Sequence, residues 1–376
     1  LSEAELSAFG NQADLTDTLK ALVPSYTATP ATGDGSAFIR PTSLRGMAPD
    51  QTLVLVNGKR RHRSALVQFF APAAGNGAHG VDIGMIPSIA LSNIQVLRDG
   101  AAAQYGSDAI AGIMNFVYKD NAEGTQVEIR SGSYKEGDGD AWRIAANVGL
   151  PFTDDGFANL SVELQETDAT SRSVQRADAQ GLYDGGNTNI WNYPLPAQTW
   201  GSPEVSDDLK LVLNLGLALD NSKDFYLFGN YAERKVLGGF FFRNPTNRGG
   251  VFSKDGGATR LVGDVAQATT GAARTCPVVP VPAAGAGSPS DVALAAIKAN
   301  PNCFVFNEVF PGGFTPSFGG SVSDWSIASG VKGNTASGTL YDVSVSVGEN
   351  QADYYIENTL NGSLGPNSPT SFNPGS

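Results

Sequence analysis

Stretches in which apolar and polar residues alternate recur along the sequence after Glu123. Every second residue from Trp142 to Leu150 is apolar, and a leucine occupies every second position from Leu209 to Leu219. A period of two places successive side chains on opposite faces of an extended strand. The pattern predicts about seven strands with unlike faces. They lie near 125–133, 140–151, 156–169, 209–220, 223–237, 323–333 and 337–349.

The connections between these strands alternate between short and long. Short turns are expected at 153–156, 221–223 and 333–336, and long loops at 170–208, 238–322 and 350–376. This alternation is typical of a transmembrane β-barrel, and an outward row of leucines on one strand suits lipid. A soluble β-sandwich is the alternative, since its strands alternate as well. Polar residues are expected on the inward face: Arg143, Asn147, Ser161, Glu163, Gln165, Asp342 and Ser344.

The residues before Glu123 have a different pattern of apolar and polar positions. A short helix is predicted at Asp14–Leu22, where leucines recur at helical spacing, and a buried strand at Thr52–Val56. The first 122 residues are therefore expected to form a small mixed α/β domain, and residues 123–376 a barrel portion. Seven strands cannot close a barrel, and one wide enough to hold such a domain has about 22 strands. The sequence is therefore expected to be the N-terminal part of a larger protein.

Composition narrows the function classes. The net charge of −12 argues against nucleic acid, which needs a basic surface. No apolar run approaches the roughly 20 residues of a membrane-spanning helix. The two histidines stand in no metal or triad motif, and the glycine pattern at 75–80 lacks the strand and helix of a dinucleotide site. The sequence therefore predicts no enzyme, no cofactor and no metal site.

The only two cysteines, Cys276 and Cys303, lie in the long 238–322 loop. One pair in a loop-rich region predicts a disulfide and an oxidising compartment, with two free buried thiols as the alternative. Between them, 290–299 has the pattern of a capped helix that ends before Pro301.

Several motifs in the first domain resemble a known family in the family's order. They are DLTDTLKALVPSY, FIRPTSLRG, TLVLVNGKRRH, MIPSIALSNIQVLRDG and QYGSDAIAGIMNFVYK, all within Asp14–Lys119. This region is similar to the plug domain of TonB-dependent outer-membrane receptors. The resemblance implies a plugged β-barrel in the Gram-negative outer membrane that imports a scarce substrate, such as a siderophore or a glycan. The implied partners are the TonB–ExbB–ExbD complex, outer-membrane lipid, the substrate and, for glycan importers, a surface lipoprotein.

The resemblance also suggests residue roles. Arg45 and Arg98 match two plug arginines that are buried against barrel glutamates and act as a latch; the matching glutamates are expected beyond Ser376. Substrate contacts are expected from the plug apices and the loops. The candidates are Arg60, Arg61, His62, Arg63, Phe69, Phe70, Asn76, His79, Trp191 and Trp200. The alternative for the arginines is pairing with carboxylates of the barrel lumen. Two other functions stay open: a plugged-barrel sensor without import, and a secreted β-rich adhesin or enzyme.

Overall fold

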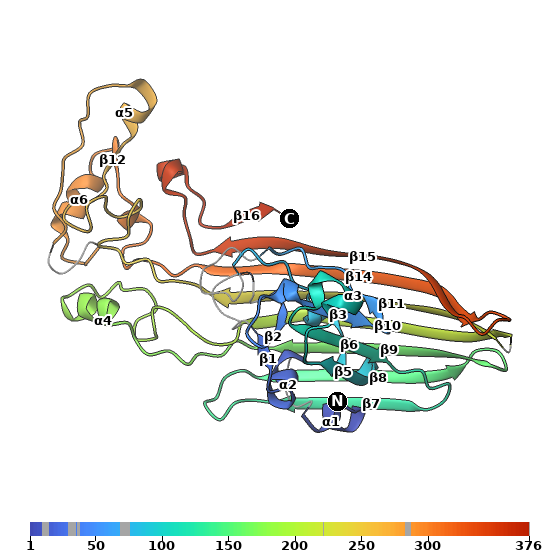
Figure 1. Ribbon diagram of the computed structural model, residues 1–376. Helices are drawn as coiled ribbons and strands as arrows, with labels where there is room; N and C mark the ends of the chain where they lie inside the picture. Colours follow the sequence, from blue (N-terminus) through green and yellow to red (C-terminus); the bar gives the residue numbers. More distant parts are fainter. Residues whose placement is uncertain are drawn as a thin grey trace.

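The chain forms two packed parts in a computed structural model (Figure 1). The structure describes residues 1–9, 15–28, 35, 38–67, 76–220, 222–282 and 287–375. The N-terminal unit, defined here as the elements up to residue 118, packs against one face of a large sheet, which we call the wall. Among the described residues, no helix has the length and apolar character needed to cross a membrane.

The N-terminal unit contains a four-stranded sheet in the order β4-β3-β6-β5 and a small β1-β2 pair. Strands β3 and β6 are parallel, and the other pairs are antiparallel. The strands are β1 (Tyr26–Ala28), β2 (Thr42–Leu44), β3 (Thr52–Val56), β4 (Lys59–Arg60), β5 (Leu91–Leu97) and β6 (Gly112–Tyr118). The α-helices are α1 (Glu3–Phe9), α2 (Leu15–Leu22) and α3 (Ala102–Tyr105), and short 3-10 turns lie at Pro49–Gln51, Ile83–Met85, Ser88–Ala90 and Ser107–Ala109.

Burial explains the central position of β3. All five of its residues are buried, as expected for a parallel strand covered on both faces. Gly112 opens the neighbouring strand β6 with φ of +139°, and an added Cβ would lie 2.3 Å from the Leu97 carbonyl oxygen. Only glycine fits this position without strain. The predicted helix is present as α2, whereas α1 was not predicted; Asp14 lies outside the described residues.

The wall is an eight-stranded antiparallel sheet in which sequence neighbours are also spatial neighbours, from β7 to β16. Its strands are β7 (Thr125–Gly132), β8 (Ala141–Pro151), β9 (Gly156–Thr167), β10 (Glu204–Asp220), β11 (Lys223–Gly239), β14 (Ser317–Asn334), β15 (Leu340–Glu357) and β16 (Phe372–Gly375). All seven predicted strands are present, and several are longer than predicted. The 350–376 loop was predicted wrongly, because β15 continues to Glu357 and β16 follows.

The two faces of the wall differ as the alternation predicts. On β10 the inward residues Asp208, Lys210 and Asn214 are buried, whereas Leu211 on the opposite face is 40% exposed. The outward face is apolar, and the inward face carries polar groups toward the N-terminal unit.

Long connections leave the wall at one end and short turns at the other (Figure 1). The 168–203 connection contains α4 (Ala177–Asp184). The 240–316 connection folds into a separate lobe; its elements are β12 (Gly263–Asp264), α5 (Val265–Thr270), α6 (Val292–Lys298), β13 (Cys303–Phe304) and the 3-10 turn Phe306–Glu308. A further 3-10 turn, Gly362–Asn367, precedes β16.

Candidate functional site

The centre of the contact between the two parts is Arg61, which follows β4. Its side chain is almost fully buried and forms an ion pair with Asp324 of β14. Its guanidinium also donates to Asn230 Oδ1 of β11 and to Ser326 Oγ of β14, both at 2.5 Å. A buried cation needs a carboxylate and further acceptors to offset its desolvation, and this site supplies both.

His62 extends the same contact. Its Nε2 lies 2.8 Å from Asp324 Oδ2, which also accepts from the Asn350 side-chain amide at 3.0 Å. The wall has no side chain where His62 approaches it: a Cβ added to Gly348 would lie 2.3 Å from His62 Nδ1. The Ala65 amide donates to Asn350 Oδ1 at 2.7 Å. Strands β14 and β15 are therefore shaped to receive residues 61–65.

A second contact lies nearer the long-loop end. Arg234 of β11 donates to the Phe38 carbonyl oxygen and lies 3.4 Å from Asp82 Oδ2. Asp82 Oδ1 accepts from the backbone amides of Arg40 and Gly84, at 3.1 and 2.9 Å. The Asp82 carboxylate thus joins two segments of the N-terminal unit to one wall arginine.

The Phe38 ring forms the apolar part of this contact. It is fully buried and lies 5.7 Å from the Phe318 ring and 5.3 Å from the Tyr354 ring, centroid to centroid. Gly320 lies beneath it, where an added Cβ would be 3.4 Å from the ring. Aromatic rings at these separations attract each other beyond simple burial.

The short-turn end has polar contacts too. Lys59 Nζ lies 2.8 Å from Asp342 Oδ2, and Tyr226 donates to the other oxygen of Asp342 at 2.7 Å. Asn57 of the N-terminal unit donates to Asn214 Oδ1 of β10 at 3.3 Å. The N-terminal unit is therefore held along the length of the wall by hydrogen bonds and ion pairs as well as by apolar contacts such as those around Phe38.

Beside these contacts the wall contains a buried charge network. Glu163 accepts from Arg143 at 2.6 Å and from Lys210 at 3.0 Å. Lys210 also lies 2.8 Å from Asp208, and Arg143 donates to Ser88 of the N-terminal unit at 2.9 Å. A cavity of about 420 Å³ lies between the network and the N-terminal unit.

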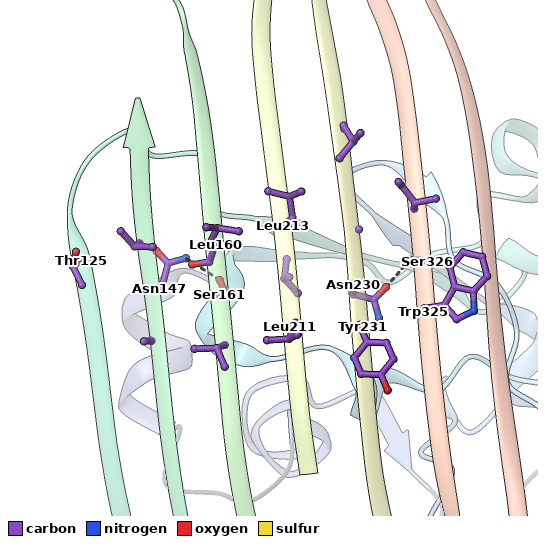
Figure 2. Close-up of a pocket in the computed structure, with 17 residues that line it drawn as sticks. Thr125, Asn147, Leu160, Ser161, Leu211, Leu213, Asn230, Tyr231, Trp325 and Ser326 are labelled. Atoms are coloured by element: carbon purple, nitrogen blue, oxygen red, sulfur yellow. Dashed lines mark hydrogen bonds between the residues drawn. The ribbon is translucent and has the colours of Figure 1, made fainter. Parts of the chain in front are cut away.

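The outward face of the wall carries an apolar groove of about 780 Å³ across β8 to β14. Figure 2 shows Leu160, Leu211 and Leu213 on its adjacent strands. At one edge, Tyr231 donates to Glu233 at 2.8 Å and Trp325 to Glu349 at 3.3 Å. Apolar residues bordered by aromatic side chains with polar partners are what the outside of a membrane barrel requires.

The comparisons with known proteins agree with this geometry. The family described as TonB-dependent Receptor Plug Domain matches residues 1–113. The chain carries the plug domain of the TonB-dependent receptors. Its N-terminal unit is the plug, its wall belongs to the β-barrel, and its location is the outer membrane of Gram-negative bacteria.

Named relatives share the plug region. The chain is 33% identical over 119 residues to the "Probable TonB-dependent siderophore receptor PirA" of Acinetobacter baumannii, covering 31% of this chain and 16% of that protein. It is 38% identical over 81 residues to the "Vitamin B12 transporter BtuB" of Vibrio vulnificus, covering 22% of this chain and 11% of that protein.

The fold has solved counterparts. A mutant of the ferric enterobactin receptor of Pseudomonas aeruginosa, solved with enterobactin, has a TM-score of 0.55 at 16% identity. The alignment covers 99% of this chain and 44% of that receptor. At this identity the likeness concerns the fold alone, and the chain spans less than half of the solved receptor.

The two latch candidates lie at the exposed surface of the plug. Arg45 donates to the Ile110 carbonyl oxygen at 3.1 Å, and Arg98 is exposed at the end of β5. Within the described part of the chain neither forms an ion pair with a carboxylate. Burial against glutamates outside this sequence stays a prediction.

The basic run that begins at Arg60 divides in two. Arg60 and Arg63 both pair with Asp108 of the plug, whereas Arg61 and His62 contact the wall. For Arg61 the structure shows a pairing with a carboxylate on the inward face of the wall, as in the alternative interpretation. A role of Arg61 or His62 in substrate binding stays a prediction.

The other substrate candidates are dispersed. His79 contacts the Ser64 carbonyl oxygen, Asn76 is exposed, and Phe69 and Phe70 lie outside the described residues. Trp191 packs against a small apolar cluster of the 168–203 connection, and Trp200 packs edge-on to Phe241 at 5.2 Å. Their role in substrate binding stays a prediction.

Sequence reasoning missed the wall residues Asp324, Asn230 and Arg234, and the plug residue Asp82. Three of them lie on predicted strands, at positions that alternate with outward residues such as Trp325 and Tyr231. A polar or charged residue at an inward position of a predicted strand was therefore the sequence signal that could have identified these contacts.

The outer lobe is closed by the predicted disulfide between Cys276 and Cys303. The predicted helix is α6, whose first turn is capped by Asp291, and Asp291 also forms a buried ion pair with Arg260. A small apolar cluster that includes Ile297 surrounds the disulfide. The lobe therefore has its own core beyond the wall.

Asp264 joins the start of α5 to the segment around the disulfide. Its carboxylate accepts from the backbone amides of Gln267, Thr275 and Cys276, at 2.9, 2.7 and 3.1 Å. These bonds lower the pKa of Asp264 from 3.8 to about 2. The folded lobe therefore favours the ionised carboxylate, whose stabilising effect is complete above pH 3.8 and is lost as the pH falls through about 2.

We expect Asp264→Ala to speed amide hydrogen exchange across 264–276 at pH 6, because three backbone donors lose their acceptor. Hydrogen exchange with mass spectrometry of the intact receptor measures this. Asp264→Asn is the matched control: it keeps an oxygen acceptor that does not titrate, so its exchange should be intermediate and show no added change in protection below pH 4. Wild-type exchange rates in Asp264→Ala at pH 6 would contradict the role of Asp264.

Proposed function

We propose that the receptor imports a scarce substrate through its barrel, with the plug as the gate and the TonB–ExbB–ExbD complex as the energy source. The main support is the polar attachment of the plug to the wall at Arg61, His62 and Asp324. Hydrogen bonds exchanged for water cost little net free energy, so such an attachment can be released and remade. A continuous apolar interface of the same size would be far costlier to open.

The relatives support a small-molecule substrate. Their names specify a siderophore receptor and a vitamin B12 transporter, and a ferric enterobactin receptor shares the fold. We propose a siderophore, a glycan or a similar small molecule as the substrate of this receptor. Outer-membrane lipid is the proposed neighbour of the apolar face, and for a glycan substrate a surface lipoprotein is a further proposed partner.

Uptake measurements test this proposal. The complete receptor is expressed in a Gram-negative host that lacks its own receptors for the compounds used. Iron-labelled ferric enterobactin, labelled cyanocobalamin and labelled malto-oligosaccharides are supplied separately. We expect receptor-dependent accumulation of one of them in the parent host and none in a host without TonB. Accumulation without TonB would contradict energy coupling, and binding without accumulation would indicate a sensor.

A further inference from the structure

Three arginines of the long connections have a carboxylate partner. Arg172 pairs with Asp138, Arg176 with Asp178 and Arg260 with Asp291. Across the described ranges of the chain, Arg243 and Arg248 form no ion pair with a carboxylate.

Arg243 is held in place by the chain around it. Its backbone amide donates to the Phe314 carbonyl oxygen at 2.7 Å, and the Phe314 amide donates back at 3.2 Å. Its guanidinium lies over the Phe240 ring, 5.3 Å from the centroid. Partial burial and the neighbouring positive charge of Arg248 lower the pKa of Arg243. Two neighbouring cations without a carboxylate are an incomplete arrangement, because an added anion would relieve their repulsion.

Aromatic rings continue from Arg243 in two directions. The Phe240 ring lies 5.4 Å from Phe241, which lies 5.2 Å from Trp200. On the other side Phe240 lies 6.0 Å from Phe318, which contacts the Phe38 ring of the plug. Phe240, Phe241, Trp200 and Phe318 are each partly exposed, so a planar ligand can pack on this row.

We propose that Arg243 and Arg248 form a binding site for the anionic group of an aromatic ligand, whose ring packs on the row from Trp200 to Phe318. The proposal rests on the proposed function, since it describes how an imported substrate would be held at the outer end of the wall. The cation pair selects for negative charge, and the rings select for planarity.

The test compares two small probes that share one ring, anionic salicylate and neutral salicylamide. Their dissociation constants for the intact, detergent-solubilised receptor are measured by saturation-transfer NMR. We expect salicylate to bind about tenfold tighter than salicylamide, as a charge-assisted contact predicts. Arg243→Gln and the exposed-site variant Arg248→Gln should each remove most of this preference, and Arg243→Lys should keep part of it.

Lys254→Gln removes one exposed positive charge from the same lobe and is the matched control; it should leave the preference unchanged. Equal binding of the two probes to the wild type, no binding of either, or wild-type preference in both arginine variants would overturn the proposal. The uptake measurement is independent: a receptor that prefers salicylate yet imports nothing would contradict the proposed function and leave the site in place.

Discussion

Asp324→Ala should loosen the plug more than any other single change at the interface. It removes the carboxylate that Arg61 and His62 share, and it leaves the buried Arg61 guanidinium without an opposite charge. Breaking a buried pair in this way typically costs about 3–5 kcal/mol. We expect the complete receptor to pass ions in planar lipid bilayers, where the wild type stays closed, and to release the plug at a lower temperature in calorimetry.

Asp342→Ala is the control for this change. Asp342 also joins the plug to the wall, through Lys59, but its side chain is 41% exposed, and exposed pairs contribute about 1 kcal/mol or less. This variant should remain closed to ions. If Asp324→Ala conducts no more than Asp342→Ala, the Arg61 contact does not hold the plug.

The strands were predictable because alternation records which face is buried. Their ends were harder to predict, for identifiable reasons. β10 begins at Glu204 rather than near 209, because its register shifts between Ser206 and Leu209 and the shift breaks the alternation. β14 begins at Ser317 rather than near 323. Gly319 and Gly320 lie near its start and suggest a loop rather than a strand.

Both of these glycines have packing roles within β14. A Cβ on Gly319 would lie 2.3 Å from the Val236 carbonyl oxygen, and Gly320 underlies Phe38. Because glycine has no side chain, Val236 and Phe38 can approach these two positions closely in the folded structure. Glycine in a strand interior often marks such a close approach, and sequence alone does not distinguish this from a turn.

The interface was predictable in kind but not in its pairs. The inward polar residues indicated a wall with polar contacts, and pairing of the plug arginines with lumen carboxylates was one of two open interpretations. Arg61 and Asp324, however, are 263 residues apart in the chain. Which inward charge pairs with which arginine depends on the register of seven successive strand pairs and on the position of the plug against the wall. A single sequence does not specify these.

Glu163→Ala should destabilise the wall itself. Glu163 lies between Arg143 and Lys210, and all three side chains are buried on the inward face. Without Glu163, the two cations keep Glu128 and Asp208 as their carboxylate partners among the described residues. Loss of one member of a buried charge network costs about 3–5 kcal/mol. We expect less folded receptor in the outer membrane, measured as the fraction that migrates as compact barrel in unheated gel samples, and a lower unfolding temperature.

Glu166→Ala separates this effect from the loss of any acidic residue on β9. Glu166 is three residues along the same strand, on the outward face, where it accepts one hydrogen bond from Trp142 at 3.0 Å. Among the residues that the structure describes, no buried charge pairs with Glu166, so this variant should fold and assemble like the wild type. Equal losses in the two variants would mean that the Glu163 network stabilises the wall no more than an exposed contact does. A selective loss in Glu163→Ala would show that the inward face depends on paired charges even where the plug does not supply them.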